Sequence, residues 1–247
     1  MEEIIKLLKE IEEEKNIEIL YALESGSRAW GLDNEDSDYD IRFIFKMPIK
    51  DYISLKNKKD ALDIMIGDYD IVGWDIKKAL KLHYKDNPNL REWMKSPIIY
   101  MGNCDFLKDL PDFDKDVLKY HYASIANNAW QSSLKSEEMD RKSTKLYLYS
   151  IRCILAWKCA NLGKDSSIRI FDLIEDSEID DGLKNDINAL IAYYKSSCQN
   201  DLDEDLINRL SIWINECVIN IKGHYPKKEK KDMSIYDKTL FEVLGLW

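Results

Sequence analysis

Two strand patterns separated by a short polar segment constrain the fold of this chain more than any other feature. Ile17–Leu23 is an apolar run rich in residues that favour strands, and Tyr39–Lys46 (YDIRFIFK) is a second. Asp38 and Asp40 lead directly into the second run. Side chains at i and i+2 of a strand point to the same face. We therefore expect a sheet in which two aspartates lie side by side at the start of a strand.

The Asp-x-Asp pattern alone is not specific, because it occurs seven times in a chain with 46 acidic residues. Paired carboxylates repel each other, and a fold keeps them when a cation lies between them. A hard divalent ion fits such a pair, above all Mg²⁺, which takes further ligands from water and phosphates. The alternative is a solvated acidic turn in the hydrophilic stretch NEDSDYD. Taken by itself, the pair favours this alternative.

A glycine–serine pair upstream reverses that preference. Gly26-Ser27 follows the first strand pattern, opens a short helical turn, and is separated from Asp38 by ten residues. Glycine lets the backbone approach a phosphate closely, and a helix start presents free N–H groups. The Ser27 hydroxyl adds a donor and Arg28 adds charge. Triphosphate chemistry needs both parts, because one grips the β- and γ-phosphates while the other holds metal over the α-phosphate.

These residues carry a resemblance to a known superfamily. The pattern Gly26-Ser27-x10-Asp38-x-Asp40 resembles the signature of the polymerase-beta-type nucleotidyltransferases. The longer segment ESGSRAWGLDNEDSDYDIRFIF, at 24–45, is similar to the branch of predicted nucleotidyltransferases associated with RNA-repair operons, the RlaP-like proteins. Further similarity lies at 70–82, 87–100 and 145–160. The resemblance thus covers about residues 20–160.

The resemblance implies a third carboxylate on a neighbouring strand, as a metal ligand or as the base for the attacking hydroxyl. Asp70 is the favoured candidate, because it lies inside a predicted strand. Asp68 belongs to a predicted hairpin turn, Asp75 suits a helix N-cap, and Asp63 is a fourth candidate. Two Mg²⁺ ions, with Mn²⁺ as the alternative, would then be bound by Asp38, Asp40 and Asp70. Gly26, Ser27 and Arg28 would bind the nucleotide.

Several residues have a structural and a functional interpretation. Lys145, Tyr149 and Arg152 share one face of a predicted helix, which is either a solvated face or, for Lys145 and Arg152, part of the nucleotide site. Arg42 either contacts a phosphate or balances the aspartates, and balancing is favoured. For the tryptophans beside the motifs, core packing is the commoner role and stacking on a base is the alternative: Trp30 and Trp74.

The composition limits the partners. With 36 basic and 46 acidic residues the net charge is −10, which argues against coating of nucleic acid, so an RNA would be held at its end. The basic stretch at 227–231 is expected to be an exposed linker, with a weak RNA contact as the alternative. The five cysteines lack CxxC spacing and predict free thiols, and the three histidines form no zinc pattern. No segment predicts a signal peptide or a membrane span, and we expect a cytoplasmic protein.

The order of patterns predicts an α+β fold. Residues 1–110 are expected to form a polymerase-beta-like nucleotidyltransferase domain, a small mixed sheet with helices, and residues 111–247 an α-helical domain. In the first part, Gly67-Asp68 predicts a hairpin and Asp75 the start of a helix. In the second part, long helical patterns cover 114–135, 141–162, 181–197 and 203–222.

The expected reaction is transfer of a nucleoside monophosphate from an NTP, with ATP favoured, to an acceptor hydroxyl with loss of pyrophosphate. The resemblance points to an RNA end as acceptor, such as that of a tRNA, in RNA repair. One alternative is adenylylation of a protein or a small molecule. Another is a sensor that binds nucleotide or RNA without catalysis.

Overall fold

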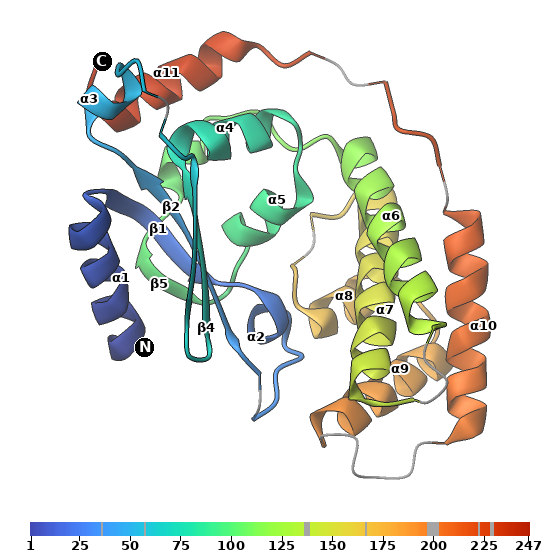
Figure 1. Cartoon of the computed structure of the whole chain (residues 1–247). Coiled ribbons are helices and arrows are strands. Elements are labelled where there is room, and N and C mark those ends of the chain that lie inside the picture. The colour runs from blue at the N-terminus through green and yellow to red at the C-terminus, as the bar shows by residue number, and fades with distance from the viewer. Residues whose placement is uncertain are drawn as a thin grey trace. The chain divides into compact units, whose positions relative to one another are not determined.

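A computed structural model covers the chain (Figure 1). The described residues are 1–35, 37–56, 58–135, 139–165, 167–196, 203–221, 223–227 and 230–247. Contacts divide the chain into two compact units. The sheet unit consists of Met1–Ala29, Ser37–Phe113 and Glu229–Trp247, and the helical unit consists of Trp30–Asp36 and Asp114–Lys228. The predicted division at residue 110 stays a prediction of domain organisation. The contact units group two segments differently, the loop after residue 29 with the helices and the last helix with the sheet.

The sheet unit is built on a five-stranded mixed sheet with the strand order β3-β4-β2-β1-β5 (Figure 1). The strands are β1 (Glu18–Glu24), β2 (Tyr39–Lys46), β3 (Ala61–Ile66), β4 (Tyr69–Asp75) and β5 (Ile99–Gly102). β2 and β4 are parallel, whereas β1 pairs antiparallel with both β2 and β5, and β3 pairs antiparallel with β4. The two central strands β2 and β4 therefore start at the same edge of the sheet.

One face of the sheet is covered by α1 (Glu2–Lys15) (Figure 1). Its apolar stripe is buried against residues of the strands: Ile4, Leu8 and Ile11 pack with Ile19, Ala22, Ile41, Phe43, Phe45, Ile71 and Tyr100. Acidic Glu2 and Glu3 begin the helix and Lys15 ends it, in accord with the helix dipole. This stripe thus supplies the helical side of one of the two cores of the sheet unit.

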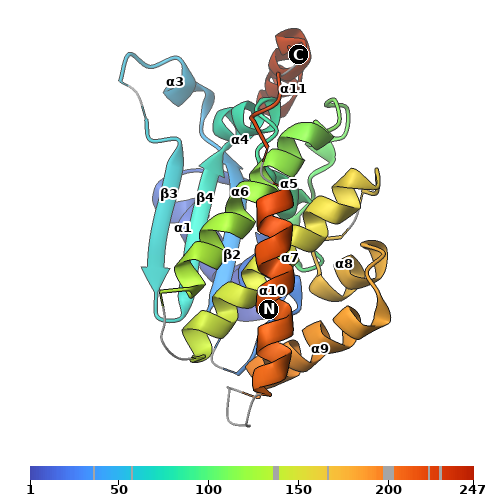
Figure 2. The same cartoon turned by 90° about the vertical axis from the view of Figure 1, so that its right-hand side faces the viewer.

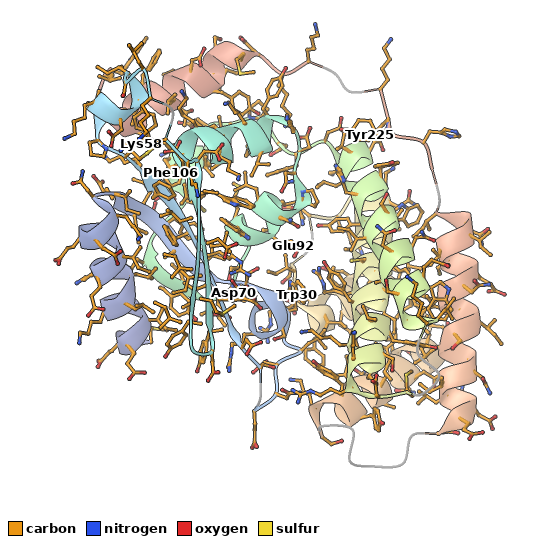
Figure 3. The ribbon with its side chains drawn as sticks, in the orientation of Figure 1. Trp30, Lys58, Asp70, Glu92, Phe106 and Tyr225 are labelled. Carbon is orange, nitrogen blue, oxygen red and sulfur yellow. The ribbon has the colours of Figure 1, made fainter. Side chains whose placement is uncertain are left out.

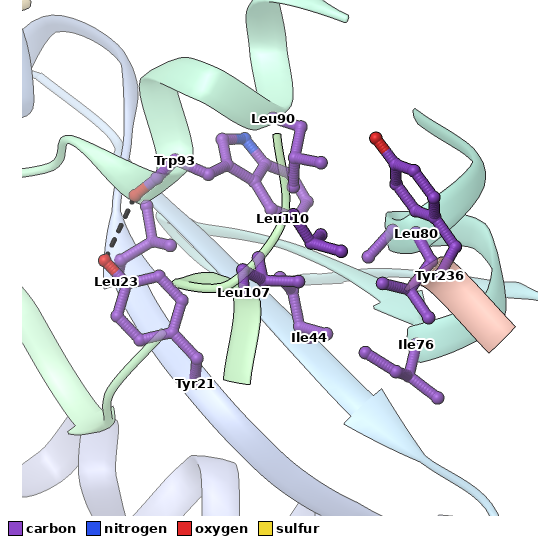
Figure 4. Close-up of a cluster of buried hydrophobic side chains, with 11 residues drawn as sticks. Tyr21, Leu23, Ile44, Ile76, Leu80, Leu90, Trp93, Leu107, Leu110 and Tyr236 are labelled. Atoms are coloured by element: carbon purple, nitrogen blue, oxygen red, sulfur yellow. Dashed lines mark hydrogen bonds between the residues drawn. The ribbon is translucent and has the colours of Figure 1, made fainter. Parts of the chain in front are cut away.

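The other face carries three helices: α4 (Ile76–Tyr84), α5 (Pro88–Met94) and α11 (Met233–Leu244). Figure 4 shows this second core, in which Tyr236 of α11 lies beside Ile76 and Leu80 of α4. The Tyr21 hydroxyl donates a hydrogen bond to the Trp93 carbonyl oxygen at 3.1 Å. Short helical segments at Ile49–Tyr52 (α3) and Asp105–Leu107 (η1) complete the unit, with α2 (Gly26–Trp30) leading out of it.

The described part of the helical unit contains four longer helices and one short one, α8 (Figure 2): α6 (Lys115–Ser133), α7 (Arg141–Asn161), α8 (Ile170–Asp176), α9 (Asp181–Lys195) and α10 (Glu204–Asn220). α6 and α7 lie side by side, and α10 packs against both. Aspartate side chains cap several of these helices, as when Asp140 accepts a hydrogen bond from the Ser143 amide at 2.7 Å. The predicted fold class, a mixed sheet followed by a helical region, is confirmed.

The local predictions agree with the observed elements. The Gly67-Asp68 hairpin joins β3 to β4, and Asp75 caps α4. The short helix α8 was missed, because its single apolar turn is weaker than the long periodic patterns on either side. No helix in the described parts of the chain combines the length and the apolar character needed to cross a membrane. Four cysteines are free thiols, Cys104, Cys153, Cys159 and Cys217, whereas Cys198 lies outside the described residues.

Candidate active site

The glycine–serine pair lies directly against the start of β2. The Ser25 amide donates a hydrogen bond to the Asp40 carbonyl oxygen at 2.8 Å, and Gly26 begins α2 with φ of +60°. A Cβ atom at position 26 would overlap the Asp40 carboxylate. Glycine is therefore required here twice, for the left-handed backbone and for the close approach of Asp40. Ser27, the next residue of α2, is buried.

Asp40 and Asp70 are partners across the two parallel strands β2 and β4. Asp70 is the second residue of β4, after the hairpin turn (Figure 3). One nitrogen of Arg42, Nη2, donates hydrogen bonds to both carboxylates, at 2.7 Å to Asp40 Oδ1 and 2.8 Å to Asp70 Oδ2. The Arg42 side chain is 14% exposed, against 28% for Asp40 and 31% for Asp70. The favoured prediction for Arg42, that it balances the aspartates, agrees with this geometry.

Asp38 precedes the first residue of β2, and its side chain is exposed. Its position is set through Arg28 of α2. The Arg28 guanidinium donates to the Ser37 carbonyl oxygen at 2.7 Å and to the Asp38 carbonyl oxygen at 3.3 Å, and it lies over the Tyr39 ring at 3.9 Å. Arg28 therefore holds the approach to β2, a role that the sequence did not indicate.

The other candidates for the third carboxylate have different surroundings. Asp75 is the last residue of β4, and its buried carboxylate accepts hydrogen bonds from the Lys77 amide at 2.8 Å and the Tyr52 hydroxyl at 2.6 Å. Burial raises the pKa of Asp75 above its ordinary value. Asp68 is exposed in the hairpin turn, and Asp63 is exposed on β3. Asp70 is the candidate that the sheet brings to Asp40.

Glu24, the last residue of β1, was missed by the sequence reasoning. Its side chain is fully buried, and it accepts hydrogen bonds from the Asp40 amide at 2.8 Å and from the Tyr100 hydroxyl. Burial raises the pKa of Glu24, against the lowering effect of the Tyr100 hydrogen bond. The available signal was a charged residue at the end of an apolar strand, directly before the Ser25-Gly26 turn.

Lys145 and Arg152 belong to α7, in the helical unit, and differ in their surroundings. Lys145 is exposed, whereas Arg152 is 1% exposed and lies over the Trp30 ring at 4.0 Å. Trp30 in turn stacks on Tyr149, with ring centroids 5.2 Å apart. Arg152 is thus no part of a solvated face, and one ring face of Trp30 is already stacked. Trp74, in the sheet unit, stacks on Trp93 at 3.7 Å.

The donor set at Asp40 and Asp70 fits a hard cation. The described residues contain no group of three or more His, Cys, Asp or Glu side chains arranged to hold a metal ion. The two carboxylates nevertheless converge on one positively charged nitrogen, so the fold already gathers them around a cation. Mg²⁺ takes oxygen ligands and is bound through one or two carboxylates, with waters and substrate phosphates supplying the rest. A pair of aspartates beside a glycine–serine turn meets that requirement.

Comparisons with known proteins identify the family of the chain. The chain matches the family described as "RNA repair pathway DNA polymerase beta family" (RlaP) over residues 1–241. It is 33% identical over 242 residues to YcgL of Bacillus subtilis (strain 168), described as an uncharacterized protein, and the match covers 94% of this chain and 91% of that protein. The crystal structure of a nucleotidyltransferase-like protein from Exiguobacterium sibiricum 255-15 superposes with a TM-score of 0.39 at 12% identity, over 92% of this chain and 73% of that one. A match over nearly the whole length shows the family, and the chain belongs to the RlaP family of polymerase-beta-type nucleotidyltransferases.

Proposed function

We propose that this protein is a divalent-metal-dependent nucleotidyltransferase that moves a nucleoside monophosphate from an NTP to an acceptor hydroxyl, with release of pyrophosphate. Family membership supports nucleotidyl transfer as the general activity. The observation that carries the proposal is the register of β2 and β4, which pairs Asp40 with Asp70 beside the Gly26-Ser27 turn. Phosphate-binding backbone and metal-binding carboxylates are thereby neighbours.

Each residue has a distinct part in this proposal. Asp38, Asp40 and Asp70 would hold two Mg²⁺ ions, with Mn²⁺ as a substitute. When bound, these ions neutralise the triphosphate and lower the pKa of the acceptor hydroxyl. Gly26 and Ser27 would bind the β- and γ-phosphates through main-chain N–H groups and the hydroxyl, and Arg28 would keep Asp38 in place. Glu24 would fix the Asp40 backbone from the buried side.

The proposed substrates are ATP and the end of an RNA, such as a tRNA. The family description supports RNA repair as the setting. The net charge of −10 supports an acceptor that is gripped at its terminus, because an extended contact with the phosphate backbone needs a surplus of lysine and arginine. Lys145, exposed on α7, is the proposed further contact for the nucleotide.

Incubation with each α-labelled NTP, Mg²⁺ and a panel of acceptors tests the proposal. The panel contains RNAs with defined ends, tRNA, unrelated proteins and small hydroxyl compounds. We expect label on RNA, its loss on metal chelation, and its loss by at least about 10²-fold in Asp40→Asn, Asp70→Asn and the double variant Asp38→Asn/Asp40→Asn. Asp68→Asn, which changes an exposed aspartate of the same hairpin, is the matched control and should label like the parent.

The same experiment separates the alternatives. Label on a protein or a small molecule, with none on RNA, would identify an adenylyltransferase with a different acceptor. Binding of NTP without label on any acceptor would identify a sensor. Equal labelling by the double variant and the parent would contradict the metal site.

A further inference from the structure

The side chain of Arg42, on β2, is held by hydrogen bonds to residues of both β2 and β4. Its Nη1 donates to the main-chain carbonyl oxygens of Asp70, at 2.8 Å, and Ile41, at 3.1 Å. Its Nη2 donates to the carboxylates of Asp40 and Asp70, at 2.7 and 2.8 Å. The guanidinium is thus tied to the backbone by one nitrogen and to both carboxylates by the other. Few side chains other than arginine offer this fork of donors.

We infer that Arg42 is an internal cation that competes with the divalent metal for the Asp40–Asp70 pair, so that it sets the metal affinity of the site. This inference rests on the proposed function, because it assigns the pair to a metal. In the metal-free protein Arg42 holds the two carboxylates together through Nη2. When a divalent ion binds, Nη2 gives up its bonds to the carboxylates, and Nη1 retains its bonds to the carbonyl oxygens.

Arg42 and a divalent ion compete for electrostatic reasons. Without a cation the two carboxylates, paired in register on neighbouring strands, would repel each other. A divalent ion bound to the same oxygens would lie within a few Å of the guanidinium, and two positive charges at that separation in a mostly buried site repel strongly. Both the attraction of Arg42 to the carboxylates and its repulsion of a metal ion come from its positive charge. Removing that charge should therefore destabilise the metal-free protein and strengthen metal binding.

The competition distinguishes Arg42 from an ordinary structural arginine. A residue that only held the carboxylates in place would lower metal affinity when removed. A residue that bound phosphate would lower NTP affinity in the absence of metal. A competing cation does neither, and its removal raises metal affinity.

Mn²⁺ binding, measured by the electron paramagnetic resonance signal of the free ion, tests the inference on the full chain without turnover. We expect Arg42→Gln to bind Mn²⁺ about tenfold or more tightly than the parent. Arg42→Lys keeps the charge and should stay within about threefold of the parent. In thermal unfolding, Arg42→Gln should melt below the parent without metal and gain more from Mn²⁺ than the parent does.

A measurement on the parent alone covers the case in which Arg42→Gln does not fold without metal. With ¹⁵N-labelled arginine, the Nη signals of Arg42, assigned by their absence in Arg42→Lys, should shift as Mg²⁺ saturates the site. Equal or weaker Mn²⁺ binding by Arg42→Gln, or Nη signals that do not respond to Mg²⁺, would overturn the competition. Weaker NTP binding by Arg42→Gln in a chelator would overturn it in favour of a phosphate contact.

Mn²⁺ binding by Asp70→Asn distinguishes failure of the competition from failure of the proposed metal site. If the parent binds Mn²⁺ and Asp70→Asn does not, the metal site stands even when Arg42→Gln shows no gain. If neither the parent nor Arg42→Gln binds Mn²⁺, both the metal site and the competition are wrong.

Discussion

The Asp40 carboxylate packs against Gly26 so closely that a Cβ atom at position 26 would overlap it. The turn proposed to bind phosphate and the aspartate proposed to bind metal therefore have a fixed relation to each other. A substitution at either position must disturb the other, and this contact can be tested apart from the general cost of changing a glycine.

Gly26→Ala should abolish nucleotidyl transfer, with a loss of at least about 10²-fold, because it displaces Asp40. Gly67→Ala is the matched control: φ is +56° there, against +60° at Gly26, and a Cβ at position 67 would meet no atom within 4 Å. In both variants the free energy of unfolding should fall by about 1–2 kcal/mol, because alanine is strained in the left-handed backbone conformation. Labelling assays and urea denaturation of both variants separate the two effects, and full activity in Gly26→Ala would contradict the contact.

Arg28 is expected to act by holding the Ser37–Tyr39 segment. Arg28→Lys keeps the charge but loses the fork that reaches two carbonyl oxygens, and it loses the planar group over the Tyr39 ring. We expect both Arg28→Lys and Arg28→Gln to lower kcat by about 10- to 100-fold. Steady-state kinetics provide the check. Rescue by lysine would instead assign Arg28 to a simple charge contact with the nucleotide.

Asp75 should affect stability and its pH dependence. Asp75→Ala removes the N-cap of α4 and the partner of the Tyr52 hydroxyl, at a cost of about 1–3 kcal/mol. Because burial raises the pKa of Asp75, the folded state keeps its proton to higher pH than the unfolded state does. Its contribution to stability is therefore lost as the pH rises from the unfolded pKa, about 3.9, through the raised folded pKa.

Asp75→Asn keeps an N-cap acceptor and removes this titration. Its stability relative to the parent should increase across that pH interval and then stay constant. Urea denaturation at several pH values measures the difference, with Asp68→Asn on the exposed hairpin turn as the control, expected within about 0.5 kcal/mol of its parent throughout. If the difference in free energy of unfolding between Asp75→Asn and the parent does not change with pH, the raised pKa of Asp75 is contradicted.

Arg152 and Lys145, which share a face of α7 in the sequence, should behave differently. Arg152→Met removes a buried guanidinium from the Trp30 and Tyr149 rings and should cost about 2 kcal/mol or more. Lys145→Met should change stability by less than about 0.5 kcal/mol, because the side chain is exposed. Chemical denaturation gives the stabilities, and NTP titration then tests Lys145 alone. Unchanged NTP affinity in Lys145→Met would remove it from the proposed site.

Lys231 should be a structural residue within the basic stretch. Its ammonium group lies 2.5 Å from Asp86 Oδ1, whose side chain is fully buried, and it donates to the Asp112 carbonyl oxygen at 3.0 Å. Lys231→Met removes the ammonium group from that buried carboxylate and should cost about 3–5 kcal/mol. Exposed Lys230→Met is the control. Equal unfolding midpoints for the two variants would contradict this role and would favour the alternative interpretation of 227–231 as a weak RNA contact. Residues 228 and 229 of this stretch lie outside the described residues.

Local patterns predicted the parts of the site that depend on neighbours in the sequence. The strand containing Asp40, the hairpin before Asp70 and the cap at Asp75 all follow from short-range rules of alternation, turn chemistry and capping. The resemblance to a known superfamily implied a third carboxylate on a neighbouring strand, and the register of β2 and β4 places Asp70 beside Asp40, whereas its role as a metal ligand stays a prediction.

Long-range contacts were beyond such rules. Glu24 is buried beside Tyr100, which belongs to another strand. Arg152 is buried by tertiary packing, which the periodicity of the sequence does not predict. Lys231 and Asp86 lie 145 residues apart in the chain, so nothing in the composition of the basic stretch marks one of its lysines as the partner of a buried aspartate. Each of these contacts joins a charged residue to a distant partner, and charged residues are predicted to be exposed by default.

The return of α11 to the sheet has a consequence for synthesis on the ribosome. Tyr236 fills the core next to Ile76 and Leu80, and Lys231 neutralises Asp86, yet both residues are made after every helix of the helical unit. The nascent helical unit can form its own core while the sheet unit still lacks α11, one of the three helices on that face. The sheet unit that carries Asp40 and Asp70 is therefore completed only after the helical unit has been made, when residues 230–247 leave the exit tunnel.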